Sequence, residues 1–339
     1  MSLFSSHKRT STESLDEIRS RNPTRQERAR WHTSVIAVFF VALLVAGCGR
    51  SSASGARDGS KQRPLVVMLI PSETGSESVL DDYAPIFTAI TRAHDIHFDL
   101  RMGDSYNAVV EGMVAGHIDI AYFGSVTFDE AKRRGAAELL AVEERAGESV
   151  YYSGLFHRHD SGMTSITDLR GKSLALGDPK STSSFNVPLA MLLDAGIDPP
   201  RDLAKILMAG SHSASLEQVE AGHVDVAAAS LNAYDKMVAA GSLNNKKVVL
   251  LVKSFAIPSP PLAMRKNLPD EIRSRLRKAF RDLHETPGVT PETLLGYGGK
   301  MVDRYNTEFD PAVYDQTMAR LSRVTPELVS ELIDKASEH

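Results

Sequence analysis

Three consecutive hydroxyl side chains, Ser181, Thr182 and Ser183, lie between a strand-like apolar run, 173–176, and a helix-like run, 189–193. The first turn of a helix has backbone N–H groups without intrahelical partners, and the helix dipole gives it partial positive charge. Such a terminus binds phosphate-like anions, and the three hydroxyls add donors at the same point. The segment therefore predicts an oxyanion site. The alternative is a helix N-cap with spare hydroxyls.

Strand-like and helix-like stretches alternate along the chain from residue 65 onward. This alternation predicts an α/β fold with mostly parallel sheets. The segment 257–262 contains three prolines and is predicted to interrupt regular structure. The predicted strands are 65–70, 97–100, 118–123, 173–176, 206–209 and 248–252. The predicted helices are 79–94, 105–115, 126–134, 189–193, a helix from 211 to near 222, 269–283 and 313–332, the last with a break at Pro326.

A short unit occurs twice. Residues 115–121 are Ala-Gly-His-Ile-Asp-Ile-Ala, and residues 221–227 are Ala-Gly-His-Val-Asp-Val-Ala. The separation is too long for a solenoid repeat and suits two similar lobes, with chance similarity of helix-to-strand joints as the alternative. We expect Asp119 and Asp225 to have local structural roles and not to contact a ligand.

Composition excludes several classes of protein. The chain has 339 residues and a formal net charge of −4, so it has no basic surface of the kind that binds nucleic acid. Its only cysteine is Cys48, which excludes a disulfide framework and a cysteine-based zinc site.

The N-terminal segment is typical of a targeting sequence. An arginine-containing polar stretch, 1–30, leads into the apolar run 35–46, which is too short to span a bilayer and suits a secretory signal core. The run ends in small residues before Cys48, which resembles the bacterial lipoprotein processing box, where the cysteine becomes the lipidated first residue. The alternative is a short uncleaved anchor with an incidental cysteine.

These patterns predict the division of the chain. We expect a signal segment at 1–47 and a lipidated tether at 48–63. The first lobe is predicted to comprise 64–152 and 255–339, and the second lobe 153–254.

Several short segments occur in the order found in one known family. They cover roughly 65–283, and the Asp-Pro-Lys-Ser-Thr-Ser run is the most specific of them. They are Pro71-Ser72-Glu73, Tyr106 after Asp104-Ser105, the run 119–124, Tyr151, the run 177–183, His212 and the run 222–227. The chain thus resembles the substrate-binding proteins of phosphonate, phosphite and phosphate ABC transporters. The resemblance implies a two-lobed, type II-like periplasmic-binding-protein fold with a ligand cleft between lobes that close like a hinged clamp.

The resemblance also implies the ligand site. The family binds its phosphorus oxyanion with a Ser-Thr-Ser cluster, the following helix N-terminus, a histidine and tyrosines. His212 can donate from one ring nitrogen, or from both if it is protonated. Tyr151 is preferred to Tyr152 because of its spacing to Ser153. The implied ligand-binding residues are Tyr106, Tyr151, Ser181, Thr182, Ser183 and His212, with Ser72, Ser125 and Asn232 as further candidates.

The chain departs from the family pattern at four positions. Asn232 and Pro260 stand where relatives that bind aminoalkylphosphonates have acidic residues. An unpaired ammonium in a closed cleft is costly, so such a ligand is not expected. Ser184 replaces a glycine and is expected to add bulk beside the anion, and Ser125 replaces a proline and adds a donor. Both leave room for a different oxyanion.

An enzyme is the least favoured class. Ser181, His212 and Asp225 have an order that could imitate a catalytic triad, but no Gly-x-Ser-x-Gly elbow is present. A Walker-type loop and a His-Glu-x-x-His motif are also missing from the sequence. We expect no catalysis, no cofactor and no metal.

The predicted function is that of a lipoprotein on the periplasmic side of the cell envelope. It would capture phosphite, phosphate or a phosphonate and deliver it to an ABC permease and ATPase. The alternative is an oxyanion sensor that partners a membrane histidine kinase. We expect a monomer attached to the membrane by its lipid, with no nucleic-acid partner.

Overall fold

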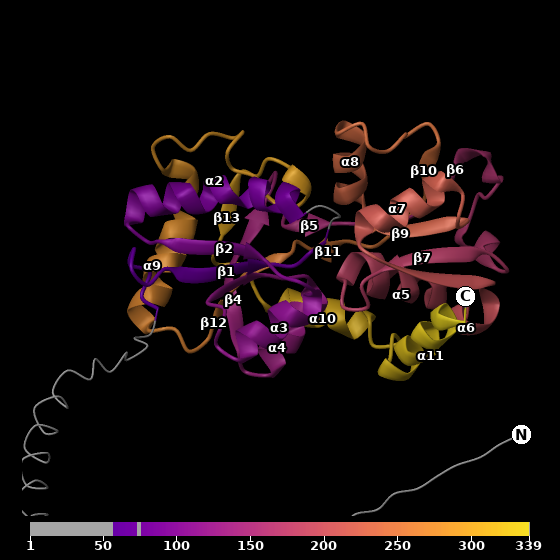
Figure 1. Ribbon diagram of the computed structural model, residues 1–339, viewed down its shortest axis with the longest axis horizontal. Coiled ribbons are helices and arrows are strands. Elements are labelled where there is room, and N and C mark those ends of the chain that lie inside the picture. Colours follow the sequence, from indigo (N-terminus) through magenta and orange to yellow (C-terminus); the bar gives the residue numbers. More distant parts are fainter. Residues whose placement is uncertain (1–56, 73–75, 339) are drawn as a thin grey trace, which may run out of the picture. The chain divides into compact units, whose positions relative to one another are not determined.

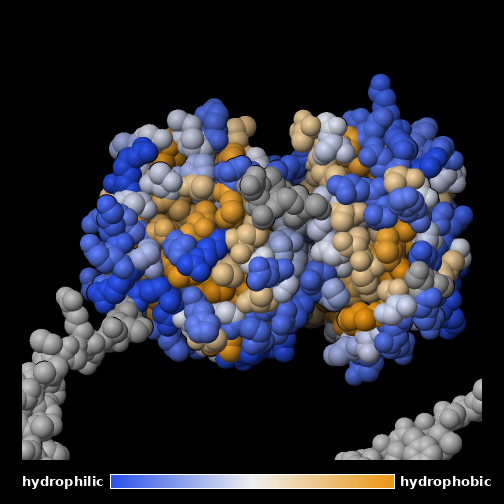
Figure 2. All heavy atoms as spheres, viewed as in Figure 1, coloured by the Kyte–Doolittle hydropathy of each residue, from blue (hydrophilic) through white to orange (hydrophobic). Residues whose placement is uncertain are grey.

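The computed structural model describes residues 57–72 and 76–338, arranged as two lobes (Figure 1). The predicted signal segment and the predicted lipidation site, Cys48, lie outside the described residues, as does Glu73. Within the described ranges, no helix is both long enough and apolar enough to cross a membrane. Hydrophilic residues cover much of the visible surface, and apolar residues gather in one area of each lobe (Figure 2).

The first lobe is built on a six-stranded sheet with the order β13-β4-β12-β3-β1-β2. In β1 the alternate residues Leu65, Val67 and Leu69 are fully buried, which is the period-two pattern of a strand with one covered face. Its strands are β1 (Leu65–Leu69), β2 (Phe98–Met102), β3 (Ile120–Tyr122), β4 (Ala137–Glu144), β12 (Pro261–Arg265) and β13 (Arg304–Asn306). Its helices are α2 (Ser76–His94), α3 (Tyr106–Val114), α4 (Ser125–Arg133), α9 (Asp270–Arg281) and α10 (Ala312–Arg320).

The second lobe is built on a five-stranded sheet with the order β10-β6-β9-β7-β8. Helix α7 (His212–Ala221) ends at Gly222, where a φ of +79° favours glycine, and strand β9 (Val226–Ser230) follows. The strands are β6 (Ser153–Arg158), β7 (Ser173–Gly177), β8 (Lys205–Gly210), β9 (Val226–Ser230) and β10 (Val248–Lys253). The helices are α5 (Val187–Asp194), α6 (Pro199–Asp202), α7 (His212–Ala221) and α8 (Leu231–Ala239).

Two short antiparallel strands join the lobes. In β5 (Val150–Tyr151) and β11 (Ile257–Pro258), Tyr151 pairs with Ile257 and Val150 with Pro258 (Figure 1). The chain passes from the first sheet to the second through β5 and returns through β11. These two strands, with a third crossing of the chain after α10 (Ala312–Arg320), can act as a hinge, because few backbone dihedrals need to change for the lobes to move.

The α/β fold with two lobes is confirmed, but the sheets are mixed and not mostly parallel. Strands β1, β2 and β3 are parallel, as are β7, β8 and β9, whereas β12 and β6 run antiparallel to their neighbours. Strands β11 and β12 have no signal in the sequence, which predicts a break at 257–262. Pro261 is tolerated there because it is the first residue of its strand.

The C-terminal stretch forms two helices. The predicted helix 313–332 is divided into α10 and α11 (Pro326–Ser337), and Thr325 caps the second with its side chain. Helix α11 packs against strand β8 and helix α6 of the second lobe. Lys335 Nζ donates to the carbonyls of Pro200 and Leu203. The predicted assignment of 255–339 to the first lobe therefore does not hold for this helix.

Candidate ligand-binding site

The hydroxyl cluster begins a helix, as its sequence predicts, but the helix starts earlier than residue 189. Ser181 is the N-cap of a π-helical turn, Thr182–Asn186, which continues directly into α5. The Ser181 hydroxyl accepts hydrogen bonds from the Ser184 backbone N–H, at 3.2 Å, and from the Ser184 hydroxyl, at 2.7 Å. Ser181 is an acceptor in both bonds, so its own hydroxyl proton remains available for donation.

All six predicted ligand residues line one small cavity. Each of these six residues is at most 3% exposed. The cavity measures about 10 Å³, which is about the room that one water molecule needs. The walls must therefore move apart to admit a larger oxyanion. The lining residues are Ile70, Tyr106, Tyr122, Gly124, Tyr151, Ser181, Thr182, Ser183, His212, Pro260 and Tyr297.

His212 is the first residue of α7 and is held as a neutral imidazole. The Ser230 backbone N–H donates to His212 Nδ1 at 3.0 Å, so the ring proton is on Nε2. Burial lowers the pKa of His212 to about 3. Of the two expected states, the structure has the neutral ring with one donor nitrogen, because Nδ1 already serves as an acceptor. His212 offers one donor, Nε2–H.

The lobes contact each other around this cavity. The Val126 backbone N–H, at the start of α4 in the first lobe, donates to Thr182 Oγ1 at 3.1 Å. A Cβ on Gly124 would lie 2.9 Å from the same oxygen, so a larger residue at that position would separate the lobes. The His212 backbone N–H donates across the cleft to the Ser72 carbonyl at 3.2 Å. These bonds describe a closed arrangement.

Ion pairs at the rim also cross between the lobes. Lys180 Nζ lies 2.6 Å from Glu130 Oε2, and Lys236 Nζ lies 2.6 Å from Asp82 Oδ2. In each pair the lysine belongs to the second lobe and the carboxylate to the first. Ion pairs that are partly open to solvent contribute little to stability on their own. The buried hydrogen bonds between the lobes are therefore expected to contribute most to the stability of the closed arrangement.

The three further candidates and Ser184 do not line the cavity. Ser72 and Ser125 are buried, and their hydroxyls have no hydrogen-bond partner among the described residues. Asn232 Nδ2 donates to the Tyr297 carbonyl at 3.1 Å. Ser184 packs on Gly177, where an added Cβ would fall 2.0 Å from Ser184 Oγ, so its bulk lies there and not beside the anion as expected.

Residues missed by sequence reasoning come from the first lobe. Tyr122 belongs to the Tyr-Phe-Gly run and could have been proposed from that run, since it ends a strand that reaches the cleft. Tyr297 follows Gly296 in a glycine-rich segment, 296–299, and nothing in its local sequence indicates a ligand site. Both rings are buried in the cavity wall.

No catalytic triad forms from Ser181, His212 and Asp225. The Asp225 carboxylate accepts hydrogen bonds from the Ser173 backbone N–H at 2.8 Å and from the Ser173 hydroxyl at 2.7 Å. His212 Nδ1 is bonded to Ser230, so Asp225 does not orient the imidazole. The arrangement can bind an anion, and it lacks the relay that would activate a serine.

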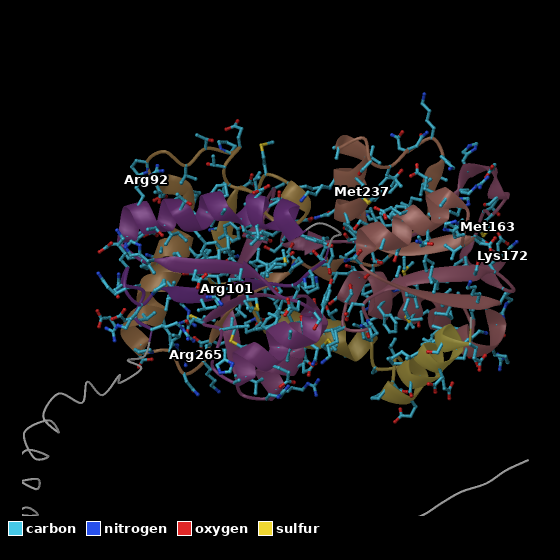
Figure 3. All side chains as sticks on the ribbon, viewed as in Figure 1. Arg92, Arg101, Met163, Lys172, Met237 and Arg265 are labelled. Carbon is cyan, nitrogen blue, oxygen red and sulfur yellow. The ribbon has the colours of Figure 1, made fainter. Side chains whose placement is uncertain are left out.

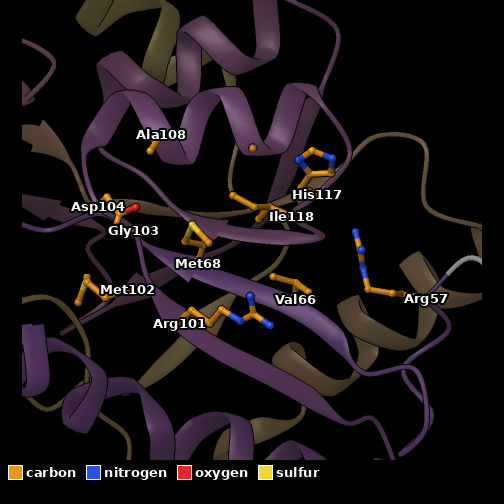
Figure 4. A pocket seen from close by; sticks show the side chains of 11 residues that line it. Arg57, Val66, Met68, Arg101, Met102, Gly103, Asp104, Ala108, His117 and Ile118 are labelled. Atoms are coloured by element: carbon orange, nitrogen blue, oxygen red, sulfur yellow. The ribbon is translucent and has the colours of Figure 1, made fainter. Parts of the chain in front are cut away.

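A larger groove lies elsewhere on the first lobe, beside β1 and α3 (Figure 4). It has a volume of about 400 Å³ and is lined in part by Arg57, Arg101 and His117. Arg57 pairs with Asp119 and Arg101 pairs with Asp99, so both guanidinium groups are already neutralised. The small buried cavity is therefore the better candidate site, because its polar groups converge on one point.

Comparisons with known proteins identify the family of this chain. Residues 67–295 match the family model described as the periplasmic substrate-binding protein of phosphonate ABC transporters. The phosphate-import protein PhnD of Mycolicibacterium smegmatis is 27% identical over 262 residues, covering 74% of this chain and 81% of the relative. The phosphonates-binding periplasmic protein of Escherichia coli is 26% identical over 239 residues, covering 69% of this chain and 70% of the relative.

Solved structures share the fold. A binding component of an ABC phosphonate transporter from Pseudomonas aeruginosa has a TM-score of 0.66 at 21% identity, covering 83% of this chain and 98% of its own. PhnD1 from Prochlorococcus marinus, solved with methylphosphonate, has a TM-score of 0.65 at 15% identity, covering 77% of this chain and 97% of its own. At these identities the likeness establishes the two-lobed architecture.

Proposed function

Because the chain belongs to the family of periplasmic substrate-binding proteins of phosphonate ABC transporters, we propose that it captures a phosphorus oxyanion between its lobes and delivers it to an ABC importer. One observation carries the proposal. Hydroxyl groups and one imidazole N–H, from both lobes, converge on a single buried cavity. Neutral donors of this kind can surround an oxyanion without opposing a full charge at each oxygen. The family itself is a non-enzymatic transport component.

The proposed mechanism is preferential binding to the closed state. Ser181–Ser183 and His212 contribute from the second lobe, and Tyr106, at the start of α3, contributes from the first. A ligand that bonds both sets stabilises the closed arrangement over the open one. The closed form then presents a surface to the permease.

We propose a phosphorus oxyanion without an ammonium group: phosphite, phosphate or a simple phosphonate. Among the described residues that line the cavity, none is acidic, and Pro260 is one of them. A buried ammonium there would have no carboxylate partner among these residues. The relatives support both phosphate and phosphonate ligands, since one is named for phosphate import and another for phosphonates.

The family location is periplasmic, and we propose lipid attachment at Cys48 as the means of retention. The proposed partners are an ABC permease and its ATPase, and the protein is proposed to act as a monomer. The sensor alternative is not favoured, because the family model describes an ABC transporter component and one relative is named for phosphate import. A histidine kinase sensor domain with a TM-score of 0.51 at 18% identity shares the fold alone.

The test is thermal unfolding of the purified protein with phosphate, phosphite, hypophosphite, methylphosphonate, 2-aminoethylphosphonate, sulfate and arsenate. A ligand at a hundredfold its dissociation constant stabilises the folded state by about 2.7 kcal/mol. We expect a shift with at least one ammonium-free phosphorus oxyanion and none with sulfate.

Matched variants complete the test. Thr182→Val keeps the shape of the side chain and removes the hydroxyl, so it should lose most of the shift. Thr317→Val removes a buried hydroxyl that donates within α10, to the Val313 carbonyl, and should keep the shift. No shift with any phosphorus compound would refute the proposed ligand class. A strong shift with 2-aminoethylphosphonate would refute its restriction to ammonium-free compounds.

A further inference from the structure

Helix α8 lies on the side of the second lobe that faces the first lobe (Figure 1). Asn232, Asp235 and Lys236 are three and four residues apart, a spacing that places their side chains on one face of the helix. Asp235 Oδ2 lies 2.6 Å from Lys300 Nζ. Lys236 Nζ lies 2.6 Å from Asp82 Oδ2. Lys300 and Asp82 belong to the first lobe, so this face of α8 contacts the first lobe.

Asn232 is the buried residue of this contact. It is 5% exposed, and its Nδ2 donates to the carbonyl of Tyr297 at 3.1 Å. A carbonyl only accepts hydrogen bonds, so the amide nitrogen of Asn232, and not its oxygen, must face the first lobe. The same carbonyl has a longer bond, from Arg145 Nη2 at 3.4 Å. Asn232 is therefore its closer donor.

The backbone of Tyr297 is held from both lobes. Its N–H donates to Glu143 Oε2, in β4 of the first lobe, at 2.6 Å, and its carbonyl accepts from Asn232 in the second. Gly298 has a φ of +71°, and a Cβ there would fall 2.9 Å from Asn232 Cβ, so only glycine allows the loop to approach α8 this closely. Separation of the lobes breaks the bond to Asn232 and leaves the bond to Glu143 intact.

This contact is separate from the ligand cavity. Asn232 is not among the described residues that line the cavity. Its bond to Tyr297 joins two groups of the protein, so it does not depend on which ligand is present. The apparent affinity of any ligand that binds the closed state is reduced by the fraction of molecules in that state. A residue that stabilises the closed state from outside the cavity therefore changes the affinity for every such ligand by the same factor.

We propose that Asn232 is a positioning residue for lobe closure, which stabilises the closed state through the Tyr297 carbonyl and does not contact the ligand. This inference deepens the proposed function, since the proposed ligand binds the closed state. Loss of a residue that contacts the oxyanion should change the ratio of affinities between two oxyanions, because specificity is a difference of binding free energies. Loss of Asn232 should weaken binding and leave that ratio unchanged.

The first test compares Asn232→Ala with Asn306→Ala in the full chain. Asn306 is the matched control, because its Nδ2 donates to Glu144 Oε2 at 3.0 Å within the first lobe. Isothermal titration uses phosphate, phosphite and methylphosphonate as probes. We expect Asn232→Ala to weaken each probe that binds by the same factor, about fivefold or more, and Asn306→Ala to change affinity less than about twofold. A change of more than about threefold in the ratio between two probes would place Asn232 against the ligand and overturn the inference.

A second variant, Asn232→Asp, keeps the shape of the side chain and removes the donor. A carboxylate in the first turn of α8 is favourable for the helix, so the variant should fold, and its melting temperature checks this. We expect it to lose affinity at least as much as Asn232→Ala, because a carboxylate oxygen then faces the Tyr297 carbonyl. It should gain no binding of 2-aminoethylphosphonate. Such a gain would show that residue 232 faces the ligand, which contradicts the inference.

Small-angle scattering of the ligand-free protein separates this inference from the proposed function. Asn232→Ala should have a larger radius of gyration than the wild type, and Asn306→Ala should not. If the wild type binds no probe but the radii differ in this way, the proposed function fails and the role of Asn232 in closure stands. If the wild type binds and Asn232→Ala matches it in affinity and in radius, only the inference fails. If nothing binds and the radii are equal, both fail.

Discussion

The repeated units 115–121 and 221–227 place their aspartates in equivalent positions in the two lobes. Asp119 accepts the backbone N–H of Val66 at 3.0 Å, and Asp225 accepts that of Ser173 at 2.8 Å. In each lobe the donor lies at the start of the neighbouring parallel strand, β1 or β7. The expected local structural role is confirmed for both. Each copy of the repeated sequence thus forms a helix–glycine–strand joint, and its aspartate bonds this joint to the neighbouring parallel strand.

The surroundings of the two carboxylates differ. Asp119 is fully buried and pairs with Arg265 at 2.8 Å and also with Arg57. Arg265 ends β12, far along the chain (Figure 3). Asp225 is half-buried and takes its second bond from the Ser173 hydroxyl, with Lys172 nearby. The same short sequence therefore places its aspartate in a buried ion-pair cluster in the first lobe. In the second lobe its aspartate only accepts hydrogen bonds from the first residue of the neighbouring strand.

The largest expected effect comes from breaking the Asp119 cluster. Asp119→Ala removes the partner of two arginines and leaves the Val66 N–H without its acceptor. Removing one partner of a buried ion pair destabilises a protein by about 3–5 kcal/mol. Urea denaturation should show this loss. A loss below about 1 kcal/mol in the free energy of unfolding would show that the cluster contributes no more than an exposed ion pair.

The second effect concerns His212, the buried imidazole of the second lobe. Because its folded pKa is about 3 and an unfolded histidine titrates near 6.5, protons bind preferentially to the unfolded state. Its contribution to stability is complete above about pH 6.5 and is lost as the pH falls toward 3, by about 1.4 kcal/mol per pH unit. Urea midpoints between pH 7 and 5 should fall less in His212→Gln than in the wild type.

The control for that slope is His223→Gln, since His223 is exposed and belongs to the repeated unit. If the urea midpoint depends equally on pH in the wild type, His212→Gln and His223→Gln, His212 is not held neutral by burial.

A smaller effect is expected from the aspartate of the second unit. Asp225→Ala removes bonds from one backbone N–H and one hydroxyl and should destabilise the fold by about 1–2 kcal/mol. Burial raises the pKa of Asp225, but the bonds from Ser173 outweigh it, so the net pKa lies below its ordinary value. Its stabilisation is present above about pH 4 and is lost as the pH falls through the lowered pKa. If Asp225→Ala is as damaging as Asp119→Ala in urea, the two lobes do not differ as described.

The smallest effect is expected at the rim between the lobes. Lys180→Gln removes the partly exposed pair with Glu130 and should change the free energy of unfolding by less than about 1 kcal/mol. Its contribution should shrink further in high salt, because exposed charges are screened. Urea denaturation of Lys180→Gln at low and high ionic strength would check this, and a large salt-independent loss of stability would contradict it.

The two lobes also supply the site differently. The second lobe contributes Ser181, Thr182 and Ser183 as neighbours in sequence, with His212 at the next helix start. A contiguous run of this kind is visible to sequence analysis because its chemistry and its local structure coincide. The first lobe contributes single aromatic residues from separate elements, such as Tyr122 and Tyr297, which have no common motif.

Sequence by itself determined the local units of this protein. Three local signals act over a few residues: the hydroxyl of the Ser181 cap, the positive φ at Gly116 and Gly222, and the continuous apolar run 65–70. The family motifs then implied which of these units carry the proposed ligand site.

Only the tertiary structure decided the rest. The helix 326–337 packs on the second sheet, Arg265 neutralises Asp119, and Tyr297 enters the cavity beside His212. Each of these contacts joins segments far apart in the chain and depends on how the whole chain packs. The physical reason is that their energy comes from burial and from charge pairing, which local sequence does not encode.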